Sequence, residues 1–292
     1  MKHLFIINPM AGKGNSLKLI PKIKKILDNL QEEYIIEITK APGQAIELVK
    51  TYVQVEDYRV YAVGGDGTLN EVLNGMVDSN SCLGVIPAGS GNDYIKSITE
   101  DASGDIIQRT IIGKERLIDI GKINDRYFLN VASVGIDAKI AFNAKKLKKL
   151  PIINGFTAYF LSIIYTLIKY KNELVSSEID DYKFHEITVL VAFGKGTSYG
   201  GGMKVLPNAL IDNGCLEVCY VKGMNKFRIL TLFPTLIKGT HGAFTKYVSF
   251  FKCKTAKVSS EVEIPINIDG EIIMSKEVNF SVLPKKIKFI VP

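Results

Sequence analysis

Cysteine and histidine are scarce in this chain of 292 residues, which has four Cys, three His and no Trp. The cysteines stand at positions 82, 215, 219 and 253, and no two of them form a Cys-x-x-Cys pair. With so few thiol and imidazole groups, the sequence argues against a zinc site. It shows no disulfide framework either, which favours a reducing compartment.

A long apolar run is lacking at the amino terminus. The run at residues 4–7 is too short for the apolar region of a signal peptide, so we expect a cytoplasmic protein. Residues 151–168 carry no charge, but this run begins with Pro and contains polar residues, whereas a spanning helix needs about 20 apolar residues. Phe156, Phe160, Ile163 and Leu167 recur at helical spacing, which favours a buried or interfacial helix over a span.

Neither disorder nor repetition describes the composition. Hydrophobic residues make up 47% and charged residues 23%, which is ordinary for a globular protein, and no solenoid period is visible. What the chain has is an excess of positive charge, +7 in total. A basic surface favours nucleotides, nucleic acid or an anionic membrane, but it does not choose among them and can equally reflect a basic proteome.

Two periods alternate over the first 120 residues, which predicts an α/β domain. Short apolar runs predict strands, and longer stretches with helical periodicity lie between them. Such alternation favours a parallel sheet with crossover helices, whose ligands bind at the carboxyl ends of the strands. The expected strands are residues 4–7, 34–38, 58–63 and 83–86, and the expected helices are residues 16–30, 42–54 and 66–76, the first capped by Asn15 or Ser16.

The pattern becomes β-rich near residue 116, so we expect two domains, 1–120 and 121–292. The last strand is a candidate to pack back on the first domain, because chain termini often lie close together. The expected strands are residues 116–123, 127–134, 186–193, 215–221, 257–263, 266–268 and 285–291, with 271–274 and 278–282 as further candidates; the expected helices are residues 138–150, 156–171 and 226–236.

Three glycine-rich loops follow expected strands. The first, residues 8–14, carries Lys13; it matches neither a Walker A loop nor Gly-x-Gly-x-x-Gly, and alone it is as consistent with an ordinary turn. The second, Gly-Gly-Asp-Gly-Thr at residues 64–68, brings Asp66 to a helix start, where three glycines allow close approach of a phosphate. A tight turn with Asp66 as N-cap is the alternative.

The third loop, residues 87–93, places Asp93 near Asp66 if the preceding strands are neighbours. Two carboxylates beside a phosphate site require a cation between them. We therefore expect Asp66, together with Asp93, to hold a magnesium ion that bridges phosphate oxygens.

Taken together, these motifs resemble the diacylglycerol kinase catalytic family, which includes bacterial lipid kinases related to sphingosine kinases. The resemblance continues through residues 128–135, Gly-Gly-Gly-Met at 200–203, Pro-Asn-Ala at 207–209 and Asp-Gly-Glu at 269–271. Gly-Gly-Asp-Gly is shared with NAD kinases and phosphofructokinases, but the other blocks are not. The resemblance implies a Rossmann-like ATP-binding domain and a β-sandwich-like lipid-substrate domain, with the active site in the cleft between them.

The resemblance also assigns residues to roles. Glu271 would be the catalytic base with Asp269 beside it; the alternative is a hairpin turn, which Asp-Gly by itself would suit. Lys13 would neutralise charge on the transferred phosphoryl group. The expected nucleotide site comprises Asn8, Pro9, Met10, Ala11, Gly12, Lys13, Thr39, Gly65, Asp66, Gly67, Thr68, Leu69, Asn70, Glu71, Ser90 and Asp93.

A second, structural magnesium site is implied in the loop at residues 210–215. Its ligands would be the carbonyl groups of Leu210 and Cys215 and the side chain of Asn213. Many relatives carry Asp at the position of Asn213, and the neutral amide should lower the affinity for a hard cation. Asp212 is the residue that would compensate.

The implied activity is ATP-dependent phosphorylation of a lipid hydroxyl, with diacylglycerol as the first candidate acceptor and phospholipid biosynthesis as the setting. The alternatives are an NAD kinase-like enzyme and a non-catalytic lipid- or nucleotide-binding module. The lysines at positions 145, 146, 148 and 149 form either a solvated helix face or a contact with anionic lipid. We expect peripheral membrane association, no nucleic-acid partner and a candidate homodimer.

Overall fold

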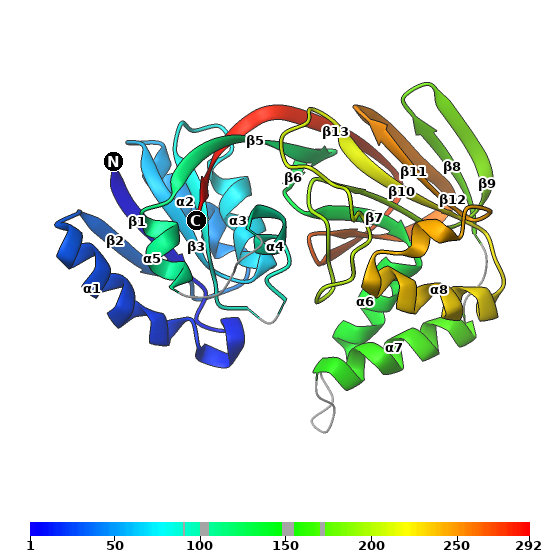
Figure 1. Cartoon of the computed structure of the whole chain (residues 1–292), viewed down its shortest axis with the longest axis horizontal. Helices are drawn as coiled ribbons and strands as arrows, with labels where there is room; N and C mark the ends of the chain where they lie inside the picture. Colours follow the sequence, from blue (N-terminus) through cyan, green and yellow to red (C-terminus); the bar gives the residue numbers. More distant parts are fainter. Residues whose placement is uncertain (90, 100–104, 148–154, 170–172) are drawn as a thin grey trace.

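A parallel sheet forms the amino-terminal half, with helices on both faces (Figure 1). The computed structural model describes residues 1–89, 91–99, 105–147, 155–169 and 173–292, with backbone only for 144–147 and 155–160. The strand order is β2-β1-β3-β4 and every pair is parallel. The strands are β1 (Lys2–Ile7), β2 (Tyr34–Ile38), β3 (Tyr58–Gly64) and β4 (Cys82–Pro87), and the helices are η1 (Ala11–Gly14), η2 (Leu17–Leu19), α1 (Ile20–Leu30), α2 (Gln44–Val53), α3 (Asp66–Met76), α4 (Ile95–Ile98) and α5 (Ile106–Ile111).

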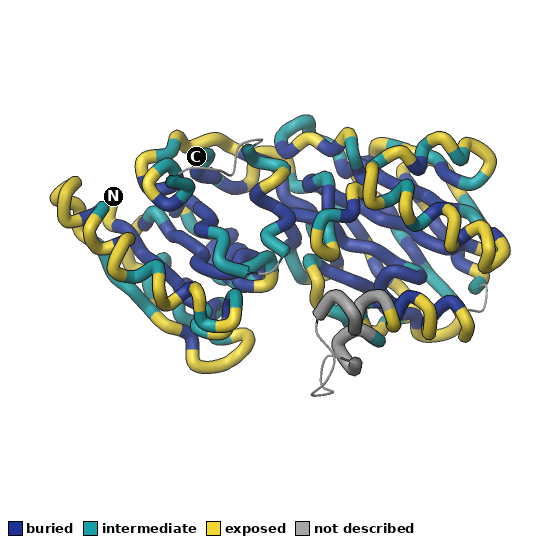
Figure 2. Tube along the Cα trace, turned by 60° about the horizontal axis from the view of Figure 1, so that its bottom comes forward, coloured by how far each residue is buried: buried dark blue, intermediate teal, exposed yellow. Residues whose placement is uncertain are grey.

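Alternating side chains of the buried strands supply the two apolar layers of this half. In β1, Leu4 and Ile6 pack with α2 and α3, whereas Phe5 and Ile7 pack with α1 and α5. A strand buried on both faces must be apolar throughout, which explains the short continuous runs in the sequence. Figure 2 shows these strands as buried tubes between more exposed helices.

The carboxy-terminal half is an antiparallel, sandwich-like arrangement whose outer sheet face is covered by helices. Its interior contains Val191 and Phe193 of β9, while the neighbouring Leu190 and Ala192 pack beneath the helices. The strands are β5 (Lys114–Ile123), β6 (Arg126–Phe128), β7 (Val131–Gly135), β8 (Glu173–Ile179), β9 (Tyr182–Gly194), β10 (Leu216–Lys222), β11 (Val248–Cys253), β12 (Thr255–Ile268) and β13 (Glu271–Val291), and the helices are α6 (Ile136–Leu147), α7 (Gly155–Lys169), α8 (Lys226–Lys238) and η3 (His241–Ala243).

Two long strands, β5 and β13, connect the halves and arch across the top of Figure 1. β13 pairs with β12 at its beginning and, through Lys288 and Phe289, runs parallel to β4 at its end. β5 accompanies β13 along most of this path, with a register shift between Leu283 and Ile287. The described strands thereby form one continuous 13-stranded sheet.

The predicted fold class, a Rossmann-like α/β half followed by a β-sandwich-like half, is confirmed. The prediction of a single strand at residues 127–134 is wrong. β6 and β7 are separated at Leu129 and Asn130, whose amides donate hydrogen bonds to the Asp269 carboxylate. β8 and β11 were not predicted, and the strands expected at 257–263 and 266–268 are one strand, β12.

Local chemistry explains why two helices begin later than predicted. α1 starts at Ile20, because Pro21 lacks an amide hydrogen and suits the first turn. Ser16 does not cap it, since its hydroxyl donates to the carbonyl of Asn8 instead (2.6 Å). α2 starts at Gln44, after Gly43 has taken a left-handed conformation.

The uncharged run maps onto α7, although residues 151–154 lie outside the described part of the chain. Ile163 and Leu167 are buried, as expected for an amphipathic helix, and the side chains of residues 155–160 lie outside the description. Among the described helices none has the length and apolar character needed to cross a membrane.

Candidate active site

The loops after β1 and β3 meet at the point where the strand order changes direction. β1 continues to β2 on one side, and the chain then crosses back to place β3 on the other side of β1. In open α/β sheets ligands bind at such a point, outside the carboxyl ends of the strands. Asn8 Nδ2 donates to Thr68 Oγ1 across it (3.1 Å), and the Thr39 amide, after β2, donates to the carbonyl of Ile7 (2.9 Å).

Glycines let three loops lie against one another at this edge. A Cβ atom on Gly89 would lie 2.5 Å from Gly65 Cα, and one on Gly12, where φ is +58°, would lie 2.2 Å from the Ala88 carbonyl oxygen. Any larger side chain would therefore force the loops apart. This packing explains Gly12, Gly65 and Gly89, which let the three loops come together.

The amino terminus of α3 is open at the same edge. The structure gives no protein acceptor to the amides of Gly67 and Thr68, as expected for the first turn of a helix without a side-chain cap. A Cβ atom on Gly67 would meet no described atom within 4 Å. Free amides, the positive end of the helix dipole and open space together form a site suited to a phosphate.

Asp66 and Asp93 flank this opening from neighbouring loops. Asp66 accepts the amides of Asp93 and Tyr94 (both 3.0 Å), and burial raises the pKa of Asp66 above its usual range. Asp93 accepts Lys96 Nζ (2.7 Å) and the amide of Gly201 (2.7 Å), which belongs to the other half of the chain. A Cβ atom on Gly91 would lie 3.3 Å from one carboxylate and 3.4 Å from the other, so the absent side chain leaves an atom-sized gap between them.

Asp269 ties the carboxy-terminal half to α3. Its carboxylate accepts the amides of Leu129, Asn130 and Val131 (3.0–3.1 Å) and Asn70 Nδ2 (2.9 Å). Burial, the largest effect, raises the pKa of Asp269 to about 6, although these hydrogen bonds favour its ionised form. A carboxylate with four N–H donors organises the backbone around it and interrupts the strand at residues 129–130.

Glu271 stands two residues further, at the start of β13, and differs sharply from Asp269. Its side chain is 57% exposed and forms an ion pair with Arg126 of β6. The Asn70–Asp269 hydrogen bond therefore brings the turn that carries Glu271 beside α3, across 199 residues of sequence. This arrangement explains how distant motifs reach one edge.

Of the remaining residues expected in the nucleotide site, some bind protein groups or lie in the core, and others are exposed. Glu71 accepts the amides of Gly43 and Ala45 and so caps α2, and the Leu69 side chain lies in the core. Lys13 is exposed on the loop after β1, without an ion pair to a described residue, and Ser90 lies outside the described residues. In the same loop Pro9, Met10 and Ala11 precede Gly12, with Met10 80% exposed.

The residues expected to hold the structural magnesium ion do not fit one. Lys195, which the sequence analysis did not single out, places its ammonium group 2.6 Å from Asn213 Oδ1 and 2.6 Å from the Cys215 carbonyl oxygen. Asp212 is paired with Arg116 instead, and Leu210 is exposed. In the part of the chain that is described, no three His, Cys, Asp or Glu side chains are grouped as metal ligands.

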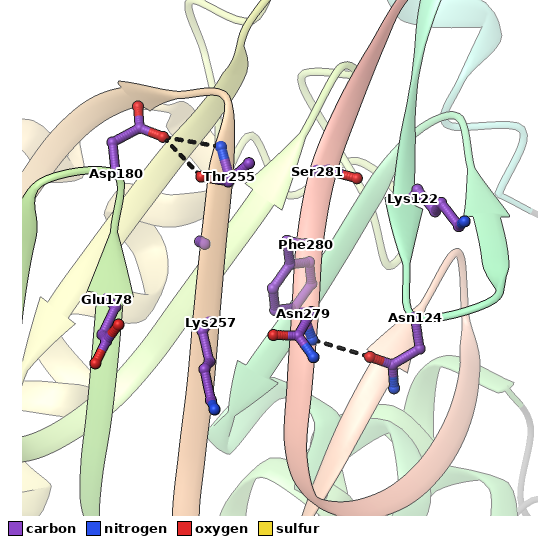
Figure 3. Close-up of a pocket in the computed structure, with 10 residues that line it drawn as sticks. Lys122, Asn124, Glu178, Asp180, Thr255, Lys257, Asn279, Phe280 and Ser281 are labelled. Atoms are coloured by element: carbon purple, nitrogen blue, oxygen red, sulfur yellow. Dashed lines mark hydrogen bonds between the residues drawn. The ribbon is translucent and has the colours of Figure 1, made fainter.

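A hollow of about 440 Å³ lies on β5, β8, β12 and β13, away from the α3 edge (Figure 3). None of the expected site residues lines it. Asp180 at its rim accepts the amides of Lys254 and Thr255, which holds the turn between strands. The chemistry therefore points to the α3 edge rather than to this hollow.

Comparison with known proteins identifies the family of this chain. Residues 2–123 match the model of the diacylglycerol kinase catalytic domain, and residues 130–291 match the YegS C-terminal NAD kinase beta sandwich-like domain. The chain belongs to the diacylglycerol kinase family. Among similar curated proteins, the diacylglycerol kinase of Staphylococcus epidermidis is 30% identical over 98% of this chain and 91% of its own length.

Other members of the diacylglycerol kinase family extend the comparison. A YegS-like lipid kinase of Shewanella frigidimarina is 31% identical over 80% of this chain and 76% of its own length. The crystal structure of a candidate diacylglycerol kinase from Bacillus anthracis covers 100% of this chain and 97% of its own, with a TM-score of 0.77. At 24% identity that structure supports the fold alone.

Proposed function

We propose that this chain transfers the γ-phosphate of ATP to the hydroxyl group of diacylglycerol, giving phosphatidic acid. The observation that carries the proposal is the open amino terminus of α3, with unpaired amides at Gly67 and Thr68 and a carboxylate pair beside it. Membership of the diacylglycerol kinase family supports phosphoryl transfer to a lipid.

The nucleotide phosphates would lie against the first turn of α3 and the loop after β1. The amides of Gly67 and Thr68 would bind phosphate oxygens, and Lys13 would add positive charge where the γ-phosphate is transferred. The expected nucleotide-site residues that already bind protein groups, such as Glu71 and Asn70, would act by holding these loops in place.

Magnesium would bind together with the nucleotide. Mg²⁺ is commonly bound by one or two carboxylates together with substrate phosphates, and Asp66 and Asp93 provide such a pair around the gap at Gly91. The ion would neutralise charge on the phosphates as the bond to the leaving oxygen breaks. No further protein carboxylate is needed for that arrangement.

Glu271 is the proposed general base. The acceptor hydroxyl oxygen forms a bond to the γ-phosphorus, the bond from that phosphorus to the β,γ-bridging oxygen breaks, and the hydroxyl proton passes to the Glu271 carboxylate and then to water. Glu271 suits this role better than Asp269, because it is exposed and Asp269 is enclosed by four N–H donors. Arg126 would hold Glu271 in position.

The lipid would enter from the side of α7 and α8, which lie side by side in Figure 1. A narrow apolar cavity of about 30 Å³ lies under these helices, lined by residues such as Ile140, Ile163 and Leu232. That volume holds a water molecule or two but not an acyl chain, so lipid binding requires the helices to separate.

The outer surface of the same helices is apolar enough to approach a bilayer. Ile164, Ile168, Phe227 and Leu230 are all exposed, with Phe227 83% accessible. Lys226 Nζ binds the carbonyl of Ile168, so the two helices present these side chains together. The lysines at positions 145, 146, 148 and 149, whose side chains lie outside the described residues, would add attraction to anionic lipid.

The test is transfer of labelled γ-phosphate from ATP to a lipid panel in mixed micelles, with NAD as a parallel acceptor. We expect Mg²⁺-dependent labelling of diacylglycerol and none of NAD. Labelling of NAD alone would favour the NAD kinase-like alternative. Absence of any transfer, with nucleotide binding intact, would favour a binding module and contradict the proposal.

A further inference from the structure

A buried ammonium group sits where the family resemblance implies a cation. Lys195, directly after β9, and Asp119 of β5 form an ion pair (2.9 Å) in which both side chains are 0% exposed. A charge removed so completely from water is costly unless other groups compensate it. The compensation here comes from β5 and from the loop at residues 213–215.

Each of the three N–H donors of Lys195 has an oxygen acceptor. The acceptors are Asp119 Oδ2 at 2.9 Å, and Asn213 Oδ1 and the Cys215 carbonyl oxygen at 2.6 Å. An ammonium group has three donors and no acceptor, so this set satisfies it completely. We call Lys195, Asp119, Asn213 and Cys215 the ammonium cage.

The cage is closed by further hydrogen bonds to Asp119. Its Oδ2 also accepts the amide of Gly214 (2.6 Å), and its Oδ1 accepts the amide of Lys285 (2.9 Å). Lys285 lies at the register shift of β13, where its φ is +49°. Because β5 and β13 join the two halves, the cage fixes the strands on which their relative placement depends.

The same oxygens could not bind a divalent cation while Lys195 is present. A carboxylate, an amide oxygen and a backbone carbonyl are the donors that Mg²⁺ and Ca²⁺ prefer, at about 2.0–2.6 Å. An ion at those distances from the same oxygens would overlap the ammonium nitrogen, which already lies 2.6–2.9 Å from them. The oxygens of Asp119, Asn213 and Cys215 therefore have room for one cation, and the ammonium group of Lys195 occupies that position.

We propose that Lys195 permanently replaces a structural divalent cation in this protein, so that the connection between the halves needs no metal. Asn213 matches this exchange, because an amide oxygen suits an ammonium group that already has one carboxylate partner. The inference concerns the fold and goes beyond the proposed kinase activity, whose failure would leave it untouched.

Thermal unfolding without nucleotide, in Mg²⁺, Ca²⁺ or EDTA, tests the proposal. The wild type and Asn213→Asp should change Tm by less than about 1 °C between these conditions. Lys195→Met combined with Asn213→Asp leaves two carboxylates and no ammonium, so saturating Mg²⁺ or Ca²⁺ should raise its Tm by roughly 5 °C or more. Lys183→Met, a change at an exposed lysine paired with Glu178, is the control and should respond to no cation.

The series is repeated on an Asp66→Asn background, so that a shift surviving there does not arise from the carboxylates beside α3. A surviving response of the wild type to Mg²⁺ or EDTA would overturn the proposal. So would a folded Lys195→Met/Asn213→Asp variant that ignores both cations. If that variant fails to fold, a cation response of Asn213→Asp alone contradicts the proposal and its absence supports it.

Discussion

Two polar clusters in this molecule differ in how fully the protein itself supplies their hydrogen-bond partners. At the edge of α3, the amides of Gly67 and Thr68 lack protein acceptors and the carboxylates of Asp66 and Asp93 flank a gap. In the ammonium cage, Lys195 is fully buried and each of its donors has an acceptor. In a cluster that stabilises the fold, the polar groups find their hydrogen-bond partners within the protein. In a cluster that binds a ligand, some polar groups lack a protein partner until the ligand supplies one.

The same contrast recurs within one turn. Asp269 has four N–H donors, and Glu271, two residues away, is mostly exposed and forms an ion pair with Arg126. Changes at Gly67 and at the exposed Glu271 should therefore reduce activity at nearly constant stability. Changes at the closed groups should reduce stability first.

The largest loss of activity is expected for Asp66→Asn. The variant keeps an acceptor oxygen for only one of the two amides that Asp66 binds, those of Asp93 and Tyr94, so Tm should fall somewhat, and it loses the charge that would bind magnesium. Metal-ion stabilisation of a transition state is worth several kcal/mol, so kcat/KM with MgATP should fall by roughly 10³-fold. Asp78→Asn, at an exposed carboxylate, is the control. Activity within about tenfold of wild type would remove Asp66 from the proposed role.

Glu271→Gln should lower kcat by about 10²–10⁴-fold, because the amide keeps the shape but cannot accept the hydroxyl proton. ATP binding and Tm should stay near wild type, since the side chain is exposed. The matched variant is Asp269→Asn, which keeps an acceptor oxygen for only two of the four N–H donors around Asp269 and should lower Tm clearly. Near-normal kcat in Glu271→Gln would show that a group other than Glu271 accepts the proton of the acceptor hydroxyl.

Gly67→Ala should raise the KM for ATP by about tenfold, the effect of filling space that a phosphate needs. In the protein itself the added methyl group meets no described atom within 4 Å, and alanine favours a helix. Tm should therefore be unchanged or slightly higher. A variant with unaltered ATP kinetics would show that the phosphates bind elsewhere.

Phe227→Ser should weaken binding to anionic vesicles by about three- to tenfold, because one exposed aromatic ring contributes only part of its apolar area. Val55→Ser is the matched control, since Val55 is also 83% exposed but lies in the other half. Vesicle co-sedimentation at two salt concentrations measures both. Equal losses in the two variants would argue against the α7–α8 surface.

Much of the first half could be predicted from local sequence signals. α3 begins at Asp66 and ends at Met76, the predicted bounds, because the glycines before it and the periodicity within it are local features. The sequence predicts the approach of Asp93 to Asp66 only if the strands before their loops are neighbours, and the pairing of β3 with β4 meets that condition. The roles assigned to the individual site residues remain predictions.

Features that depend on distant partners could not be predicted in this way. Nothing in the local pattern of residues 127–134 shows that three amides bind Asp269, about 140 residues later, and so interrupt the strand. Lys195 resembles any lysine after a strand, and its burial depends on Asp119 of β5 and on Asn213 and Cys215 of one distant loop. Sequence periodicity records neither kind of contact.

Hydrogen–deuterium exchange with and without MgATP tests the contrast between the two clusters most directly. Amides of Gly67 and Thr68 should become protected, because the nucleotide would supply acceptors that the protein lacks there. Amides of the ammonium cage, at residues 195–197 and 213–216, should exchange equally in both conditions. Protection confined to the cage, or none at the amino terminus of α3, would contradict the placement of the nucleotide.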